Sequence, residues 1–404
     1  MDETAGQSSK VETLEIAREA VKIHRESIET DSTAKQTFVS SLQYLSSQLS
    51  KTGRIEEAIT VTQEAITVLR DITGKGSTEH LPSLSGSLHN LGYYFGQRSR
   101  WADAFTATEE AAQIRRELSK HEPSEYSPLL ADSLHNLSFY LHNLGRLRPA
   151  ARAEEESVTL RRSFAKADDI TRTRDLAESL HSLSGYKANL RRHYEAVAAS
   201  EENLQAVWTL TWDDPTTYSF HLATTLHNTA THLHKAGRAR EAVTAMEESI
   251  HIRRELAKSD PPIHLPHLAH SLNTLATYLL PLGRQYESIL ALEEAVSLYR
   301  GLITTGNDIN NHTLKLAFSL YNLGVHLERT GRMKEARSAK QEALRLDPTL
   351  KPQWKLFTLV NTVYSFITSW RRAQKLSSTG ATPGSESQAK PYGAARISDA
   401  VTDL

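Results

Sequence analysis

The chain of 404 residues contains no cysteine. Disulfide bonds, thiolate nucleophiles and zinc sites built on cysteine are therefore excluded. Aromatic residues make up only 7% of the sequence, so the core has to be built mainly from leucine, alanine, valine and isoleucine. Hydrophobic residues still reach 39%, which is enough to bury a core and separates the chain from disordered proteins.

An excess of either charge is also missing, because 47 lysines and arginines face 48 acids and leave a net charge of -1. Proteins that bind nucleic acids or anionic membranes usually carry a strong basic excess, so we expect neither partner. The N-terminus MDETAGQSSK is polar, and no run of 18 apolar residues occurs. These features predict a cytoplasmic protein without a signal peptide or a membrane span.

Catalytic motifs are lacking as well. The stretch 74–78 (GKGST) differs from a phosphate-binding loop, which needs an earlier glycine and a serine or threonine directly after the lysine. The sequence holds no Gly-x-Ser-x-Gly elbow and no His-Glu-x-x-His motif. We therefore predict that the chain is not an enzyme and uses no cofactor, metal or small-molecule substrate.

What the sequence does contain is a repeat. A Leu-x-x-Leu block is followed eight residues later by a turn position and then, after five more residues, by alanine or serine. The seven turn positions are Gly53, Ser99, Gly145, Arg191, Gly237, Gly283 and Gly331. Five of the six intervals between them are 46 residues and the last is 48. A period of this kind is typical of stacked supersecondary units.

Each unit has the pattern of two helices joined at the turn position. Leu134, Leu137, Ser138 and Leu141 are spaced as one face of a helix. Glycine then ends the first helix, since it enters the left-handed conformation with least strain. The second helix begins near Arg148. Nothing in the chain alternates like a strand, so we predict an all-α protein.

The second helix of several units carries acids early and bases late, an order that suits the helix dipole. The acids in three units are Glu109, Glu110, Glu154, Glu155, Glu156, Glu247 and Glu248, and the bases are Arg115, Arg116, Arg161, Arg162, Arg253 and Arg254. We predict that these charges form a solvated outer face.

The order Leu-x-Asn-Leu, Gly-Arg, Glu-Ala resembles the tetratricopeptide repeat, most clearly in SLHNLSFYLHNLGRLRPA and SLYNLGVHLERTGRMKEA. The resemblance covers residues 37 to about 350. The usual unit has about 34 residues, and the longer unit found here looks like the repeats of kinesin light chains. The resemblance implies an α-α superhelical solenoid of about seven hairpins, and we place the extra residues between the hairpins.

The predicted domain organisation follows from this repeat. Residues 1–36 form a partial repeat of one helix, and residues 37–352 form the seven repeats. Residues 353–376 follow a stop signal at Asp347-Pro348 and predict a C-terminal capping helix, although a dimer or membrane-contact helix is an alternative. Residues 377–404 have the composition of a disordered tail.

Three positions depart from the pattern. Ser99 and Arg191 replace glycine at the turn, which should cost about 1 kcal/mol each if the backbone there is left-handed. Lys187 occupies a position where an apolar side chain is expected. We therefore expect an irregular joint after the fourth unit, whose sequence WTLTWDDPTTYSF differs from the other junctions.

A ligand of such a solenoid would lie in the concave groove lined by the first helices. If the leucines face the stack, the residue after the first leucine points away from it. Our candidates at this position are His89, His135, His181 and His227, with Tyr93 and Phe139 on the same stripe. The next position gives Asn90, Asn136, Asn228 and Asn322.

An amide offers two donors and an acceptor, so an asparagine ladder can pair with a peptide backbone in either direction. The resemblance implies that these asparagines contact ligand backbone. In the alternative, each asparagine bonds to the adjacent hairpin. The histidines lie too far apart to share a metal ion, but their protonation near pH 6 predicts a groove that favours acidic ligands at low pH.

We therefore predict a protein–protein interaction scaffold that binds an extended peptide or a partner helix. The alternative is a sensor or regulatory repeat fragment of a larger signalling NTPase or protease, favoured by the half repeat at the N-terminus. A third reading, single-stranded RNA bound one base per repeat, has precedent among helical repeats, but the near-neutral charge argues against it.

Overall fold

The computed structural model describes residues 2–27, 32–74, 78–164, 169–306 and 308–350, and all regular structure within them is helical, as the sequence predicts. In chain order the helices are α1 (Asp2–Glu26), α2 (Ser32–Lys51), α3 (Ile55–Thr73), α4 (Leu81–Gln97), α5 (Trp101–His121), α6 (Pro123–Asn143), α7 (Leu147–Phe164), α8 (Ile170–Asn189), α9 (His193–Asp213), α10 (Pro215–Lys235), α11 (Ala239–Ser259), α12 (Pro261–Leu279), the 3-10 turn η1 (Leu280–Leu282), α13 (Gln285–Thr304), α14 (Ile309–Arg329) and α15 (Met333–Leu346).

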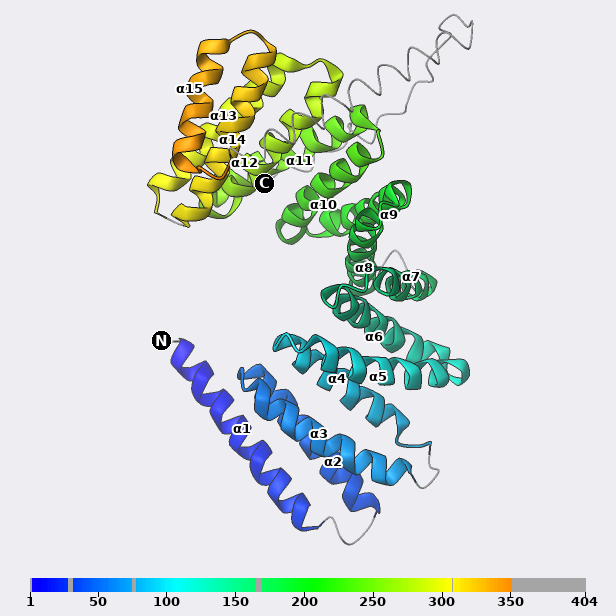
Figure 1. Cartoon of the computed structure of the whole chain (residues 1–404). Coiled ribbons are helices and arrows are strands. Elements are labelled where there is room, and N and C mark those ends of the chain that lie inside the picture. Colours follow the sequence, from blue (N-terminus) through cyan, green and yellow to red (C-terminus); the bar gives the residue numbers. More distant parts are fainter. Residues whose placement is uncertain (1, 28–31, 75–77, 165–168, 307, 351–404) are drawn as a thin grey trace, which may run out of the picture. The chain divides into compact units, whose positions relative to one another are not determined.

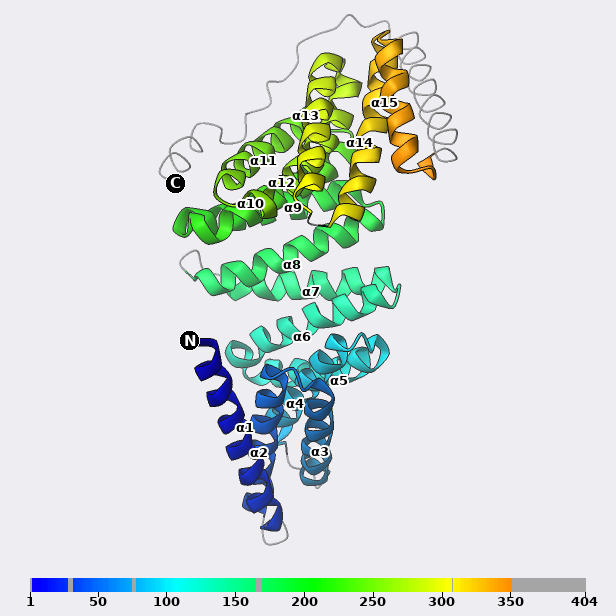
Figure 2. The same cartoon turned by 90° about the vertical axis from the view of Figure 1, so that its left-hand side faces the viewer.

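The predicted seven hairpins are the pairs α2–α3, α4–α5, α6–α7, α8–α9, α10–α11, α12–α13 and α14–α15. The chain divides into two compact units, residues 1–206 and 207–404, with the border inside α9. In the first unit α1 packs on α2, and hairpin packs on hairpin through α3 with α4, α5 with α6 and α7 with α8 (Figure 1). In the second unit α11 packs on α12 and α13 on α14 (Figure 2).

The turn inside each hairpin is the same in all seven. The residue at the turn position has a positive φ, between 56° at Ser99 and 83° at Gly237. The arginine or other residue after it donates its N–H to a carbonyl of the preceding helix, as Arg146 does to Leu141 at 2.8 Å. This bond closes the C-terminal turn of the first helix and reverses the chain. Ser99 and Arg191 therefore adopt the left-handed conformation that the repeat predicts for them.

At three junctions the extra residues lengthen the helices, where the repeat predicts a connection between hairpins, whereas residues 74–80 separate α3 from α4 as predicted. A single residue separates α5 from α6 (Glu122) and α11 from α12 (Asp260). The prolines misled that interpretation, because proline is well tolerated at the first helical position, where its missing N–H has no intrahelical partner. Asp214 alone joins α9 to α10, and the border between the two compact units lies inside α9, directly before the stretch where we expect an irregular joint.

The leucine stripe forms the core of the stack. The first leucine of the repeat is at most 2% exposed in all seven hairpins, at Leu42, Leu88, Leu134, Leu180, Leu226, Leu272 and Leu320. Alanines of the second helices, such as Ala58 and Ala150, are fully buried against these leucines. Small residues at these sites allow the paired helices to approach closely, which accounts for the low aromatic content of the chain.

Outer ion pairs connect successive second helices. Arg70 binds Glu110 at 2.7 Å, Arg116 binds Glu156 at 2.9 Å and Arg254 binds Glu294 at 2.6 Å. Further pairs of the same kind are Arg25–Glu64, Arg162–Glu202 and Arg300–Glu342. These charged residues therefore lie on a solvated outer face, as the sequence predicts. Their ion pairs connect one hairpin to the next.

Three arginines predicted on that outer face are buried instead. Arg115, Arg161 and Arg253 are 3–5% exposed, and each reaches a backbone carbonyl of the following first helix. The reason is geometric. Adjacent residues of a helix point about 100° apart, so only one arginine of each Arg-Arg pair can face solvent. Burial lowers the pKa of Arg115 to about 10, and that of Arg253 equally.

Lys187, the predicted misfit, is also buried. Its amino group forms ion pairs with Glu155 and Glu195, so two carboxylates compensate the charge that replaces an apolar side chain. The predicted capping helix at 353–376 and the tail at 377–404 lie outside the described residues. Among the described helices, none combines the length and the apolarity of a membrane span.

Candidate functional site

The predicted groove residues lie on the first helices of the hairpins, and those helices are connected by a row of side-chain hydrogen bonds. The residue after the first leucine bonds to a serine of the next first helix. His89 Nδ1 lies 3.2 Å from Ser133 Oγ, and His227 Nδ1 lies 3.0 Å from Ser271 Oγ. Gln43 with Ser87 and Asn273 with Ser319 form the same bond without histidine. Most residues at this repeat position therefore connect neighbouring hairpins of the same unit.

The burial that accompanies these bonds changes the expected pH response. Burial and the charge of Arg115 lower the pKa of His89 to about 3. Burial, Arg253 and two neighbouring histidines lower the pKa of His227 to about 3. Both rings therefore stay neutral near pH 6, so the expectation that they charge there is wrong for them. The physical reason is that desolvation disfavours the charged imidazolium.

His135 behaves differently because it meets a buried acid. Its Nδ1 lies 2.9 Å from Oε1 of Glu154, whose side chain is 0% exposed. Burial lowers the pKa of His135, but the hydrogen bond and the charge of Glu154 outweigh it and the pKa is raised. Glu154 had been predicted on the solvated outer face. Its position holds Thr62, Thr108, Ser200, Met246 and Leu292 in five other units and Lys340 in the last, so comparing the first six units in register would have indicated burial.

This cluster combines a histidine, a carboxylate and a serine, but not in a nucleophilic arrangement. The hydroxyl of Ser138 bonds to the carboxylate of Glu154 and to the backbone carbonyl of His135, and not to the imidazole ring. Ser138 is itself 0% exposed, and Tyr186 covers it with its hydroxyl at 3.4 Å. A nucleophile needs both a base within hydrogen-bond reach and access to substrate. Ser138 has the carboxylate of Glu154 within reach but is closed off from solvent. Among the described residues, no group of three or more acids and histidines is placed to hold a metal ion.

The predicted asparagines have unequal surroundings. Asn90 is exposed, whereas Asn136, Asn228 and Asn322 are partly buried. Asn136 Nδ2 lies 3.5 Å from His89 Nε2 on the preceding first helix, which is the inter-hairpin bond of our alternative interpretation. Asn322 Nδ2 is buried, and no hydrogen-bond partner for it lies among the described residues.

The aromatic candidates remain accessible. Tyr93 and Phe139 are each 48% exposed, and they occupy the same position of the repeat on α4 and α6. Trp101, at the start of α5, packs edge-on against Phe139 with ring centroids 5.8 Å apart. Such packing restricts the Phe139 ring while leaving one face open. His181 is also exposed, but its unit has Gly185 in place of the aromatic residue.

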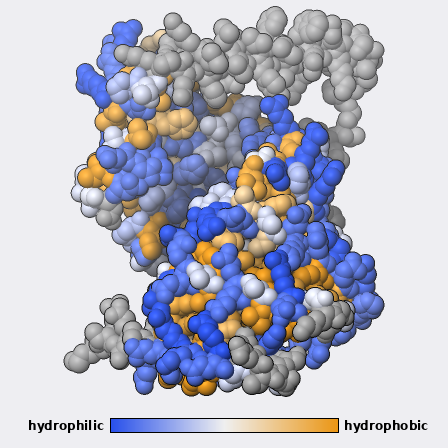
Figure 3. Space-filling view, turned by 60° about the horizontal axis from the view of Figure 1, so that its bottom comes forward, coloured by the Kyte–Doolittle hydropathy of each residue, from blue (hydrophilic) through white to orange (hydrophobic). Residues whose placement is uncertain are grey.

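One face of the molecule is mixed in character. The space-filling view of Figure 3 shows hydrophobic side chains in small groups between hydrophilic ones. Such a surface can offer several separate anchor points to a partner, each bounded by polar groups.

Comparison with known proteins agrees with this geometry. The sequence profile of the tetratricopeptide repeat matches residues 84–123, 130–163 and 222–263, which fall on α4–α5, α6–α7 and α10–α11. No curated protein matches the sequence.

Three solved structures illustrate the similarity of fold. BtubC (BKLC) from P. vanneervenii has 16% identity and a TM-score of 0.48, and the match covers 61% of this chain and 92% of that one. Kinesin light chain TPR-like repeats from Podosopora anserina have 19% identity and a TM-score of 0.44, covering 56% and 99%. The apo form of RapI has 10% identity and a TM-score of 0.42, covering 66% and 98%. The matched stretches identify tetratricopeptide repeats in this chain, and they fall on three of its helical hairpins.

Proposed function

We propose that the chain is a protein-interaction scaffold and that an extended peptide segment of a partner lies across the first helices α4 and α6. The observation that carries this proposal is the exposure of Tyr93 and Phe139, 48% each, at one repeat position on neighbouring helices. Large exposed aromatic side chains are costly to leave in water, and they dominate the binding energy of many interfaces.

Asparagine amides beside these rings would supply the polar contacts. Asn90 and Asn136 precede Tyr93 and Phe139 by three residues, so each pair lies on the same side of its helix. An exposed amide can donate to and accept from a peptide backbone. The bond between Asn136 and His89 uses the amide nitrogen, so it fixes the orientation of that side chain. In this proposal His89, His135 and His227 position the first helices, and Asn228 and Asn322 provide the corresponding contacts of the second unit.

Selection of binding peptides from a displayed random library tests the proposal. Peptides that bind the wild type should lose about tenfold in affinity for the Asn90→Ala/Asn136→Ala variant, because each lost hydrogen bond is worth about 0.5–1.5 kcal/mol. They should lose roughly thirtyfold or more for Tyr93→Ala/Phe139→Ala, as expected for aromatic anchors.

Tyr194→Ala is the matched control. Tyr194 is 76% exposed but lies on α9, a second helix, so its removal tests for unspecific aromatic contacts. Equal losses in the control and in the aromatic double variant would show that peptides do not use the face of α4 and α6. The alternative, a regulatory fragment of a signalling NTPase or protease, stays a prediction.

A further inference from the structure

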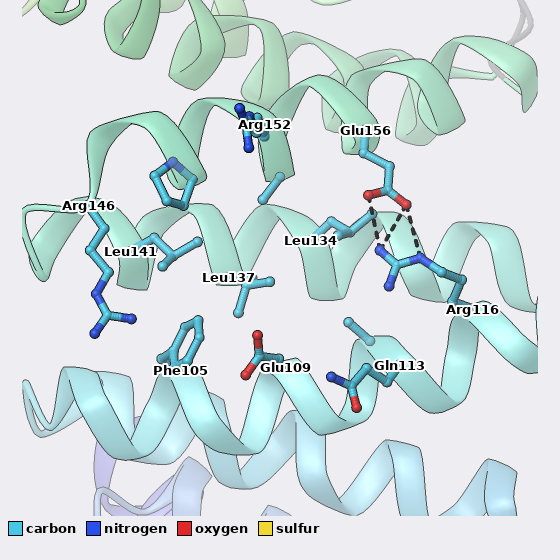
Figure 4. A pocket seen from close by; sticks show the side chains of 13 residues that line it. Phe105, Glu109, Gln113, Arg116, Leu134, Leu137, Leu141, Arg146, Arg152 and Glu156 are labelled. Carbon is cyan, nitrogen blue, oxygen red and sulfur yellow. Dashed lines mark hydrogen bonds and ion pairs between the residues drawn. The ribbon is translucent and has the colours of Figure 1, made fainter.

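A surface pocket opens on the other side of α6, away from the asparagines. Its volume is about 370 Å³ and its floor is formed by Leu134, Leu137 and Leu141 of α6. Phe105 of α5 and Arg152 of α7 lie on opposite sides of these leucines (Figure 4), and Ala153 of α7 also lines the pocket. Ligand pockets of proteins range from about 300 to 1,000 Å³, so this pocket can hold one medium-sized side chain and part of its backbone.

The pocket exists because one residue is small. Ala112 lines it, and the same position in the other units carries a larger apolar side chain. Those residues are Ile66, Val158, Leu204, Ile250 and Val296, which are buried, and Leu344 in the last hairpin, which is partly buried. Alanine removes two or three carbon atoms from a site that is otherwise filled. The floor of leucines is therefore left partly uncovered at this one hairpin.

A charged partner is missing at the same place. In six hairpins the residue after the turn is an arginine that pairs with an acid three positions later, such as Arg54 with Glu57 at 2.5 Å and Arg100 with Asp103 at 2.8 Å. The other four are Arg192–Glu195, Arg238–Glu241, Arg284–Glu287 and Arg332–Glu335. In the remaining hairpin Pro149 replaces the acid.

Arg146 is consequently left without a carboxylate. It lies over the Phe105 ring at 5.5 Å and forms no ion pair among the described residues. Arg152 also lines the pocket, is exposed and lacks an ion pair within the described part of the chain. Of the charged residues that line the pocket, Arg116 and Glu156 form an ion pair with each other. Two arginines and Glu109 remain, so the rim carries one excess positive charge.

We propose that this pocket docks a partner peptide that inserts a branched aliphatic side chain, such as leucine, and places a flanking carboxylate on Arg146. The peptide would supply the two groups that the other hairpins carry themselves. Apolar burial on the leucine floor gives affinity, and the charge-assisted bond to the guanidinium gives preference for acidic sequences. The site is separate from the face of α4 and α6, since its leucines and Asn136 lie on opposite sides of α6.

The test uses blocked pentapeptides and the full chain labelled at its alanine methyl groups. Acetyl-Ser-Asp-Leu-Asp-Ser-amide should shift the NMR signals of Ala112 and Ala153. It should bind at least fivefold more tightly than the same peptide with lysines in place of the aspartates. Replacing its leucine with alanine should weaken binding by a similar factor. Equal affinity for the acidic and basic peptides, or no shift at Ala112, would overturn the proposal.

Two variants restore the residues of the other units and should therefore keep the fold. Ala112→Ile should fill the pocket and abolish the shift at Ala153. Pro149→Glu should pair with Arg146 and remove the preference for the acidic peptide while leaving leucine-dependent binding. Asn136→Ala should change neither result, which separates this site from the proposed peptide face. Unaltered binding in both Ala112→Ile and Pro149→Glu would contradict the assignment.

Discussion

The guanidinium of Arg115 donates a hydrogen bond of 2.7 Å to the hydroxyl of Ser133 on the next hairpin, and a second one of 2.8 Å to the carbonyl of Leu129. Both atoms belong to α6, whereas Arg115 lies on α5. One buried side chain thus connects two hairpins. Arg253 repeats the arrangement with Ser271 and the carbonyl of His267.

Replacing Arg115 should therefore destabilise the first unit far more than replacing its neighbour Arg116. We expect Arg115→Met to lower the free energy of unfolding by about 2–4 kcal/mol, because buried polar groups of α6 lose their donor. Arg116→Met removes only an exposed ion pair and should cost less than about 1 kcal/mol. Chemical denaturation of the two variants measures the difference. Equal losses would mean that the buried contacts contribute nothing beyond a surface ion pair.

Glycine at the two exceptional turns should stabilise the protein. Ser99 has a φ of 56° and Arg191 a φ of 60°, a conformation that costs a residue with a Cβ about 1 kcal/mol or more. Ser99→Gly and Arg191→Gly should each raise the free energy of unfolding by about that amount.

The reverse substitution Gly53→Ser provides the control for this prediction. A Cβ at Gly53 would meet no atom within 4 Å, so any loss comes from the backbone conformation alone. Thermal unfolding that shows Ser99→Gly to be less stable than the wild type would contradict this account.

Acid should destabilise the stack through its buried histidines. The pKa of His89 and of His227 is about 3 in the folded chain and about 6.5 when unfolded. Below pH 6.5 these histidines bind protons in the unfolded state but not in the folded state. The free energy of unfolding therefore falls as the pH drops from about 6.5 towards 3.

A glutamine variant isolates this effect. Gln43 already makes the corresponding bond to Ser87 in the first hairpin, so His89→Gln should preserve the contact. The variant should equal the wild type at pH 8 and exceed its free energy of unfolding by up to about 2 kcal/mol at pH 5. A constant difference between the two pH values would rule out titration of His89 as the cause.

Glu248 should have the opposite pH dependence. Burial raises the pKa of Glu248 to about 7. Glu248 takes no part in the outer ion pairs described above, because Trp208 occupies the position of the partner arginine. Since the folded pKa lies above the unfolded value, stability falls as the pH rises from about 4.5 to 7. Glu248→Gln should raise the free energy of unfolding at pH 8 by at most about 3 kcal/mol and leave it unchanged near pH 4. Glu294→Gln, which removes a paired acid, should not stabilise the chain.

The sequence by itself determined the hairpins. A period of 46 residues, the leucine pairs and the turn positions predict the seven hairpins and their order, because helix periodicity and left-handed turns are local properties. It also marked Ser99, Arg191 and Lys187 as exceptions. Periodicity further placed Tyr93 and Phe139 on an exposed side of their helices, where the structure has them.

Only the tertiary structure decided which polar residues form the contacts between hairpins. Arg115 and Arg116 are alike in sequence, yet one is buried and the other paired at the surface. His89 and Asn90 are neighbours, yet one bonds to the next hairpin while the other stays exposed. The pocket beside Ala112 likewise depends on what the following helix brings opposite it. Such outcomes depend on the rotation and the spacing of packed helices, which a local pattern of residues does not encode.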